Sequence, residues 1–327
     1  MNILVTGGTG FIGSTLVKTL VAQHHHVIVI DNLSAGHLDN LQGVINRITF
    51  ISGNVQDFDP DYTLPPLDII FHLAGIAALA HNQANPALSI SSNVSGTANM
   101  LELARRHPIK NFIFASTGAV YENSPRLPQW EDHILQPDLT YALGKKWCEE
   151  LIESYHVNYE MPYTILRYFN IYGTGQQSKK KNPPLISYLI QQIQKNEPIS
   201  IFSDGQSLRD YLHIDDLNRL HLMVMEHTAK NITINACSGK QYSVQQIFQI
   251  IKKYLPTTIE LHHKPSADMW NHYQRLFDCK LNFKTNRVVQ EVYKTTLGCY
   301  EYTKSIYDWV PSIDMEDGIQ MIIKDIA

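Results

Sequence analysis

Two side chains four residues apart, Tyr141 and Lys145, have the spacing of a proton-transfer pair. In a helix this spacing puts both side chains on one face, one turn apart. A nearby ammonium stabilises a phenolate, so a tyrosine that otherwise holds its proton to about pH 10 can act as a base near neutrality. An ordinary surface pair has the same spacing, so the interpretation depends on the elements that position these residues.

A glycine-rich turn at the start of the chain favours the catalytic interpretation. Gly7, Gly10 and Gly13 follow an apolar strand at residues 3–6 and open a helix. This spacing is typical of a dinucleotide site, where it allows a tight turn and close approach to a pyrophosphate. The second strand ends in Asp31, whose carboxylate would accept hydrogen bonds from both hydroxyls of an adenosine ribose and would repel a ribose phosphate. The pattern therefore favours NAD over NADP.

Strands that alternate with helices through residues 1–170 predict a doubly wound parallel sheet, the Rossmann-type α/β fold. Such sheets bind ligands at the carboxyl ends of their strands. Small and polar residues stand at the predicted strand ends and in the turns that follow them. The cofactor-binding residues that we predict are Gly7, Gly10, Phe11, Ile12, Gly13, Asp31, Asn32, Ser34, Gly36, Asn54, Val55, Leu73, Ala74, Gly75, Asn93, Ser116, Tyr141, Lys145 and Tyr168.

Residues 171–327 predict a smaller, discontinuous α/β domain, with residues 211–240 returning to the first domain. Arg209 lies near a glycine turn and is a candidate phosphate-binding fork. Asp215 and Asp216 begin a helix and could simply cap it. The lysine run at 179–181 is either a solvated loop or an aid to binding an anion. Asn93, in a helix predicted over 90–106, is either a cap, a surface amide or part of the site.

Composition excludes several classes of function. The net charge of −4 gives no electrostatic footprint for nucleic acid or an anionic membrane. The four cysteines lack metal-ligand spacing and are too few for a disulfide framework, which indicates reduced thiols in a cytoplasmic protein. No apolar stretch approaches the roughly 20 residues that a membrane span needs. We expect no signal peptide, because the first strand begins at residue 2, and no metal, because the histidine runs lack companion ligands.

Together these motifs resemble the extended short-chain dehydrogenase/reductase superfamily, and within it the UDP-glucose 4-epimerase-like branch. The likeness extends along most of the chain, from the glycine fingerprint to the Arg-Tyr-Phe-Asn segment at 167–170 and the Arg-Asp element at 209–210. The catalytic residues that the resemblance implies are Thr117, Tyr141, Lys145 and Asn93, and the implied substrate-binding residues are Thr117, Asn170, Arg209 and Arg287.

The resemblance implies NAD-dependent 4-epimerisation of a UDP-hexose through a transient 4-keto sugar. Tyr141 would take the proton from the sugar O4, Lys145 would lower the tyrosine pKa, and Thr117 would hydrogen-bond O4. Asn93 would support the site. A homodimer through the helices near 90–106 and 141–157 is also implied, although their apolar faces could equally belong to the core.

Three features depart from the family pattern or refine it. Related dehydratases and decarboxylases carry acidic residues just after the catalytic Ser/Thr, whereas here Gly118 and Ala119 follow Thr117, which favours redox chemistry at C4 alone. Asn54 stands where the family usually has an Asp beside the adenine. The second phosphate-binding arginine of the family has no clear match, and Arg287 is the first candidate, with Arg275 behind it.

Two rival functions remain open at this point. A nucleotide-sugar 4-keto reductase or oxidoreductase would share every catalytic residue but would exchange its cofactor at each turnover. A non-catalytic NAD or nucleotide-sugar binding protein is a more remote alternative, because Thr117, Tyr141 and Lys145 are all present. An epimerase regenerates NAD and need not release it, so retention of the cofactor through purification distinguishes an epimerase from a keto reductase.

Overall fold

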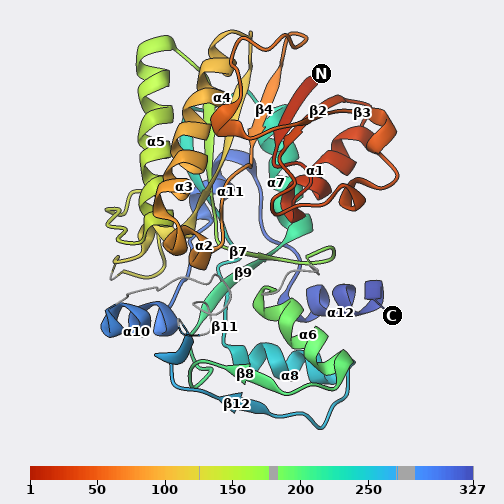
Figure 1. The fold of residues 1–327 in the computed structure, drawn as a ribbon, viewed down its shortest axis with the longest axis vertical. Helices are drawn as coiled ribbons and strands as arrows, with labels where there is room; N and C mark the ends of the chain where they lie inside the picture. Colours follow the sequence, from red (N-terminus) through yellow and green to blue (C-terminus); the bar gives the residue numbers. More distant parts are fainter. Residues whose placement is uncertain (125, 177–182, 270, 272–283, 327) are drawn as a thin grey trace.

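The main element of the fold is a parallel sheet with the strand order β3-β2-β1-β4-β5-β6-β10 (Figure 1). The computed structural model describes residues 1–124, 126–176, 183–269, 271 and 284–326. The predicted doubly wound Rossmann-type sheet is confirmed, with β10 added beyond β6. The strands are β1 (Asn2–Thr6), β2 (His26–Asp31), β3 (Ile48–Ser52), β4 (Ile69–His72), β5 (Asn111–Thr117), β6 (Tyr163–Tyr168) and β10 (Ile232–Ala236).

Helices cover both faces of this sheet because the central strands are apolar on both sides. One core layer joins α1 and α7 to the sheet and includes the buried Trp309. The opposite layer joins α4 and α5 to the sheet. These helices, with the short helices that lie near them, are α1 (Phe11–Ala22), α2 (Leu79–Ala84), α3 (Pro86–Ile90), α4 (Gly96–Arg105), α5 (Thr140–Tyr159), α7 (Ile214–Glu226) and α11 (Glu301–Tyr307).

A smaller unit packs below the carboxyl edge of the main sheet (Figure 1). Its core lies among α6, α8 and α12, next to the short sheets β11-β9-β7 and β12-β8. The chain enters it directly from β6 through β7. Its elements are β7 (Asn170–Tyr172), α6 (Leu185–Lys195), β8 (Ile199–Ile201), β9 (Arg209–His213), β11 (Gln241–Tyr242), α8 (Val244–Tyr254), β12 (Leu261–His263), α10 (Thr285–Tyr293) and α12 (Met315–Ile326).

The register of the strands brings chemistry-bearing residues to one edge. Thr117 at the end of β5 pairs with Tyr168 at the end of β6. Thr6 at the end of β1 pairs with Ile30 of β2, so Asp31 stands one residue beyond that pair. Because all strands of the main sheet run parallel, their carboxyl ends line a single edge.

Two local expectations differ from the structure. The helix predicted over 90–106 is divided into α3, a π-helical segment at Ser91–Ser95 and α4. The cap of α7 is His213, whose imidazole accepts from the Asp215 backbone N–H, and not an aspartate. Asp216 instead accepts from the backbone N–H groups of Ser312 and Ile313, and so holds the segment that leads to α12. The lysine run at 179–181 lies outside the described residues.

No helix in the described part of the chain is long and apolar enough to cross a membrane. The buried apolar side chains of the longer described helices belong to the core layers described above.

Two fully buried histidines predict that stability depends on pH. Burial lowers the pKa of His72 to about 3, with a smaller contribution from the Lys145 charge. Burial also lowers the pKa of His221 to about 3. Below the ordinary value of about 6.5 the unfolded chain binds a proton that the folded chain does not, so stability falls as the pH falls. When the pH is lowered from 7 to 5, each histidine should lower the free energy of unfolding by about 2 kcal/mol.

Urea unfolding at the two pH values measures this effect. His221→Gln should reduce the pH dependence by about 2 kcal/mol. His262 is exposed, and His262→Gln is the matched control that should leave the dependence unchanged. A His221→Gln protein with the full wild-type dependence would contradict the assignment.

Candidate active site

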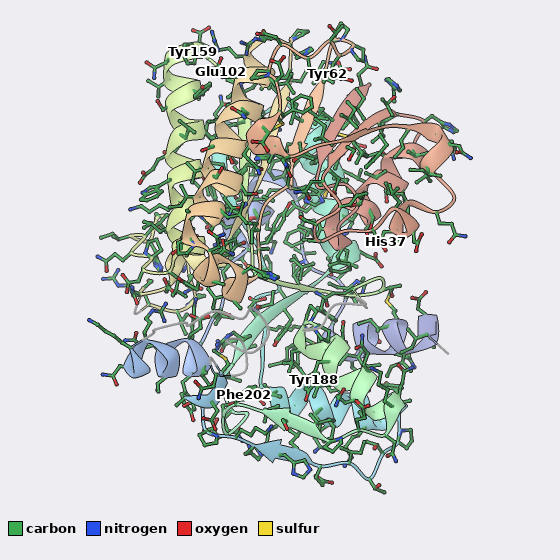
Figure 2. All side chains as sticks on the ribbon, viewed as in Figure 1. His37, Tyr62, Glu102, Tyr159, Tyr188 and Phe202 are labelled. Atoms are coloured by element: carbon green, nitrogen blue, oxygen red, sulfur yellow. The ribbon has the colours of Figure 1, made fainter. Side chains whose placement is uncertain are left out.

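A cavity of about 630 Å³ follows the carboxyl edge of the main sheet. Its volume lies within the range of ordinary cofactor pockets. Its wall also includes Ala35, His37, Asp39 and Asn40, which the sequence analysis missed; His37 is labelled in Figure 2. From the predicted cofactor residues it brings together Gly7, Gly10, Phe11, Ile12, Gly13, Gly36, Leu73, Gly75, Ser116, Tyr141, Lys145 and Tyr168.

The glycine turn suits a dinucleotide because side chains in place of Gly7 and Gly13 would collide with the neighbouring backbone. Gly7 has φ +71°, and its carbonyl accepts from the Gly10 N–H at 3.1 Å. A Cβ on Gly13 would lie 2.2 Å from the Gly7 carbonyl oxygen. Helix α1 therefore starts close to β1 with its first N–H groups unpaired within the helix, as pyrophosphate binding requires.

The Asp31 carboxylate is pre-positioned at the end of β2. Its Oδ2 accepts from the Thr9 backbone N–H at 2.9 Å, and its Oδ1 accepts from the Leu33 N–H at 2.8 Å. The side chain is largely buried. A carboxylate has about four acceptor sites, so both oxygens keep capacity for the hydroxyls of a ribose.

Other predicted cofactor residues lie off the cavity wall. Asn32 donates to Asn54 Oδ1 at 2.7 Å, and Asn54 donates to Asp57 Oδ2 at 3.0 Å, so these side chains form a chain beside β2 and β3. Ser34 is exposed, and its backbone N–H donates to Asn32 Oδ1. Val55 is buried, against Gly96 at the start of α4. The Ala74 N–H donates to the Thr6 hydroxyl.

Thr117, Tyr141 and Lys145 meet where β5 ends. Burial raises the pKa of Tyr141, and a hydrogen bond from the Thr117 hydroxyl opposes that shift. The Lys145 ammonium donates to the Ala115 carbonyl at 2.7 Å and lies 4.5 Å above the Phe114 ring. Burial lowers the pKa of Lys145. The expected lowering of the tyrosine pKa is therefore not present in this arrangement, because desolvation of the phenol outweighs its hydrogen bond.

Asn93 positions the loop after β4. Its side chain is buried, which excludes the surface-amide interpretation. Its Oδ1 accepts from the Ile76 backbone N–H at 2.8 Å, and its carbonyl accepts from the Thr97 hydroxyl at 2.6 Å. A Cβ on Gly75 would lie 2.7 Å from the same Oδ1. Asn93 does not line either cavity, so it supports the site by holding residues 75 and 76 in place.

A buried ion pair fixes α5 against the sheet. Arg167 on β6 donates through Nη2 to Glu149 Oε2 at 2.7 Å, and both side chains are at most 6% exposed. Glu149 also accepts from the Ser116 hydroxyl, and Arg167 Nη1 donates to the Tyr121 hydroxyl at 2.7 Å. The network surrounds the end of β5, directly beside Thr117.

A second cavity of about 270 Å³ adjoins the first. Arg209 and Asn170 lie on its wall, as does Thr117. The Arg209 Nη2 group donates to the Glu291 carbonyl at 2.9 Å, and burial lowers its pKa. Asn170 donates to the Asp210 carbonyl at 2.8 Å. These hydrogen bonds hold both side chains in fixed positions on the cavity wall, which suits a role in substrate binding.

Arg287 lies in α10 but not on the wall of either cavity. Its Nη2 pairs with Glu122 Oε1, and its Nη1 lies 3.7 Å from Glu291 Oε2. Sequence reasoning missed Glu122, Glu291 and Lys294, which do line the smaller cavity. No local pattern marks them, because α10 reaches the turn after Thr117 only through the tertiary fold. Arg275 lies outside the described residues.

The amino-acid sequence matches the model of the NAD dependent epimerase/dehydratase family over residues 3–237. The chain belongs to this family. A UDP-glucose 4-epimerase of Halalkalibacterium halodurans is 31% identical over 288 residues, which cover 82% of this chain and 85% of the relative.

Two solved structures of similar chains cover all of this one. The UDP-glucose 4-epimerase of Thermotoga maritima, solved with UDP-glucose, has a TM-score of 0.87 and 29% identity, with 98% of that chain covered. The UDP-glucuronic acid 4-epimerase of Bacillus cereus, solved with UDP-glucuronic acid and NAD, has a TM-score of 0.84 and 25% identity over its whole length.

In this member of the epimerase/dehydratase family, Gly13→Ala should weaken NAD binding. The added Cβ would overlap the Gly7 carbonyl, so α1 must shift from β1. An overpacked contact costs about 1–3 kcal/mol, and the same loss in binding would weaken affinity by roughly fivefold to a hundredfold. Isothermal titration of the cofactor-free protein with NAD measures the change.

Gly144→Ala is the matched control. A Cβ on Gly144 would meet only Val94 Cγ2 at 3.7 Å, an ordinary contact. This variant should bind NAD as the wild type does. Equal NAD affinity in Gly13→Ala and wild type would show that the close packing of α1 on β1 is not needed for the cofactor.

Proposed function

We propose that the protein is an NAD-dependent nucleotide-sugar 4-epimerase that acts on a UDP-hexose through a transient 4-keto sugar. The observation that carries this proposal is the junction of the two cavities, because Thr117 and Tyr141 lie on the walls of both. A cofactor in the larger cavity and a sugar in the smaller one would therefore meet at the tyrosine hydroxyl.

At this junction Tyr141 accepts the proton from the sugar O4 and later returns it. Bound NAD would supply the acceptor and donor for the C4 hydride and a positive charge that favours the phenolate. Thr117 already hydrogen-bonds the Tyr141 hydroxyl and is placed to share O4. Lys145, held by the Ala115 carbonyl, would contribute a positive charge on the wall of the larger cavity. Neither Gly118 nor Ala119 offers a carboxylate for chemistry at C5 or C6.

Epimerisation requires the keto sugar to turn over while its nucleotide stays bound. Arg209 and Asn170 supply donors on the wall of the smaller cavity, where they would hold the diphosphate. The wall near Thr117 is made by Gly118, Ala119 and Ala142, which leave room for a rotating ring. The two solved relatives bind UDP-sugars, which supports the same class of substrate here.

An NMR time course with UDP-glucose and no added cofactor tests the function, together with the Tyr141→Phe variant. The wild type should form the C4 epimer, because a regenerated cofactor remains bound. Tyr141→Phe should lower turnover by about a hundredfold or more while NAD stays bound, because general base catalysis contributes about that much.

Tyr159→Phe is the control, since Tyr159 lies on the same helix and is 54% exposed. It should leave turnover unchanged. Turnover that appears only with a keto sugar and added NADH would instead indicate a reductase. Full activity in Tyr141→Phe would remove this tyrosine from the mechanism.

We further propose that the protein is a cytoplasmic homodimer. Helix α5 exposes large apolar side chains, with Trp147 40% and Val157 78% exposed. Tyr159 at its end lies beside Glu102 of α4, so the two helices present a shared surface (Figure 2). Exposed apolar surface on paired helices is typical of a symmetric dimer interface. The thiols of Cys148, Cys237 and Cys299 are free, as a reducing compartment requires.

Trp147→Glu should therefore convert the dimer to a monomer. In the dimer, a glutamate in an apolar interface would lose its hydration without gaining an ionic partner. This loss makes dimerisation less favourable than a charge at the solvated rim would. Light scattering after size exclusion measures the mass. Trp130→Glu is the matched control, because Trp130 is equally exposed but lies off these helices. A monomeric wild type would contradict the proposal.

A further inference from the structure

Glu122 lies on the wall of the smaller cavity, five residues after Thr117. It directly follows the turn Gly118–Tyr121 that begins at Thr117, and its side chain is only 2% exposed. Its Oε2 accepts from the backbone N–H groups of Asp138 and Leu139, at 2.7 Å and 3.0 Å. Its Oε1 accepts from Arg287. Every partner is a donor, which is the pattern of an ionised carboxylate.

The contacts of Glu122 fix its position relative to the catalytic pair. Leu139 is the N-cap of α5, two residues before Tyr141. The carboxylate therefore ties the turn that carries Thr117 to the start of the helix that carries Tyr141. The bond to Arg287 holds α10 against the same place. The three donors, Asp138 N–H, Leu139 N–H and Arg287, hold the Glu122 side chain in one orientation.

The charges on the cavity wall are unevenly distributed. Among the described residues of this wall the cations are Arg209 and Lys294. Arg209 is bound to backbone of α10 and Lys294 follows the end of that helix, so both lie on the side of the smaller unit. The Arg287 guanidinium is engaged by Glu122 and Glu291 and lies behind the wall. A diphosphate would find its cations on the side away from Thr117.

Besides the hydroxyls of Thr117 and Tyr141, the side near Thr117 offers no cation to a second anionic group. Gly118, Ala119, Leu139 and Ala142 on this part of the described wall have no polar side chain. Glu122 is the charged residue on this side, and its partner Arg287 lies behind the wall, so the negative end of their ion pair is the end nearer the cavity. A hydroxymethyl group on the sugar can lie beside it or donate to it, whereas a carboxylate would meet the negative end of this pair.

We infer that Glu122 is a specificity-determining residue that restricts the enzyme to nucleotide-sugars with an uncharged hexose and rejects hexuronates. The inference rests on the proposed function, since it names the sugar class of the same cavity. It also gives Arg287 a role different from a phosphate ligand: it holds the selecting carboxylate in place.

The test compares UDP-glucose with UDP-glucuronate in binding and in turnover. Wild-type protein should favour UDP-glucose in kcat/KM by about a hundredfold or more, as a like-charge contact implies. Glu122→Gln should narrow that ratio by roughly tenfold or more, mainly through better use of UDP-glucuronate. Glu122→Asp keeps the charge and should keep the preference. Asp138→Asn removes an exposed charge on the same loop and should leave the ratio of kcat/KM for UDP-glucose to that for UDP-glucuronate unchanged.

Dissociation constants of both nucleotide-sugars, measured with NAD-loaded protein, give the same comparison without turnover. A binding preference for UDP-glucose that Glu122→Gln narrows supports the inference even if no epimer forms, which would contradict only the proposed function. Equal binding and turnover of both sugars by the wild type would overturn the inference and leave the epimerase intact. A Glu122→Gln protein that loses both substrates equally would also overturn it, because a structural role alone has that result.

Discussion

The buried ion pair between Arg167 and Glu149 is the constraint on which the site depends. Removing two charges from water is costly, and the cost is offset only when both are fully hydrogen-bonded. Here the Ser116 hydroxyl, the Tyr121 hydroxyl and the Glu131 carbonyl complete the set. These partners belong to the end of β5 and the turn and loop that follow it. The pair therefore fixes α5, and with it Tyr141, relative to Thr117.

The two cavities use different physical means of binding. The wall of the larger one combines glycines and apolar side chains with a few polar ones such as Asp39 and Lys145, and Asp31 is held off this wall at the end of β2. The smaller one is lined by charged side chains that come from both parts of the fold. A cofactor that remains bound suits a preformed backbone cradle. A substrate that must enter, turn and leave suits side chains whose charges can be matched one by one.

Local patterns in the sequence were sufficient for the cofactor half of the fold. The glycine turn, Asp31 and the Tyr141–Lys145 spacing each depend on one strand, one turn or one helix, so their chemistry can be recognised within a few residues. The π-helical segment that buries Asn93 could not be predicted, because its stability comes from contacts with the loop at Ile76. Glu122 and Arg287 are 165 residues apart, and no local pattern connects them.

The state of the Tyr141 proton shows why spacing alone is not a mechanism. Spacing puts an ammonium one turn from the phenol, which predicts a lowered pKa. In the folded chain the ammonium is bound to the Ala115 carbonyl, and burial of the phenol has the larger effect in the opposite direction. The protein part of the site therefore holds a neutral tyrosine. Under the proposed function, the positive charge of bound NAD and a hydrogen bond from the sugar O4 would have to offset this burial before Tyr141 could act as a base.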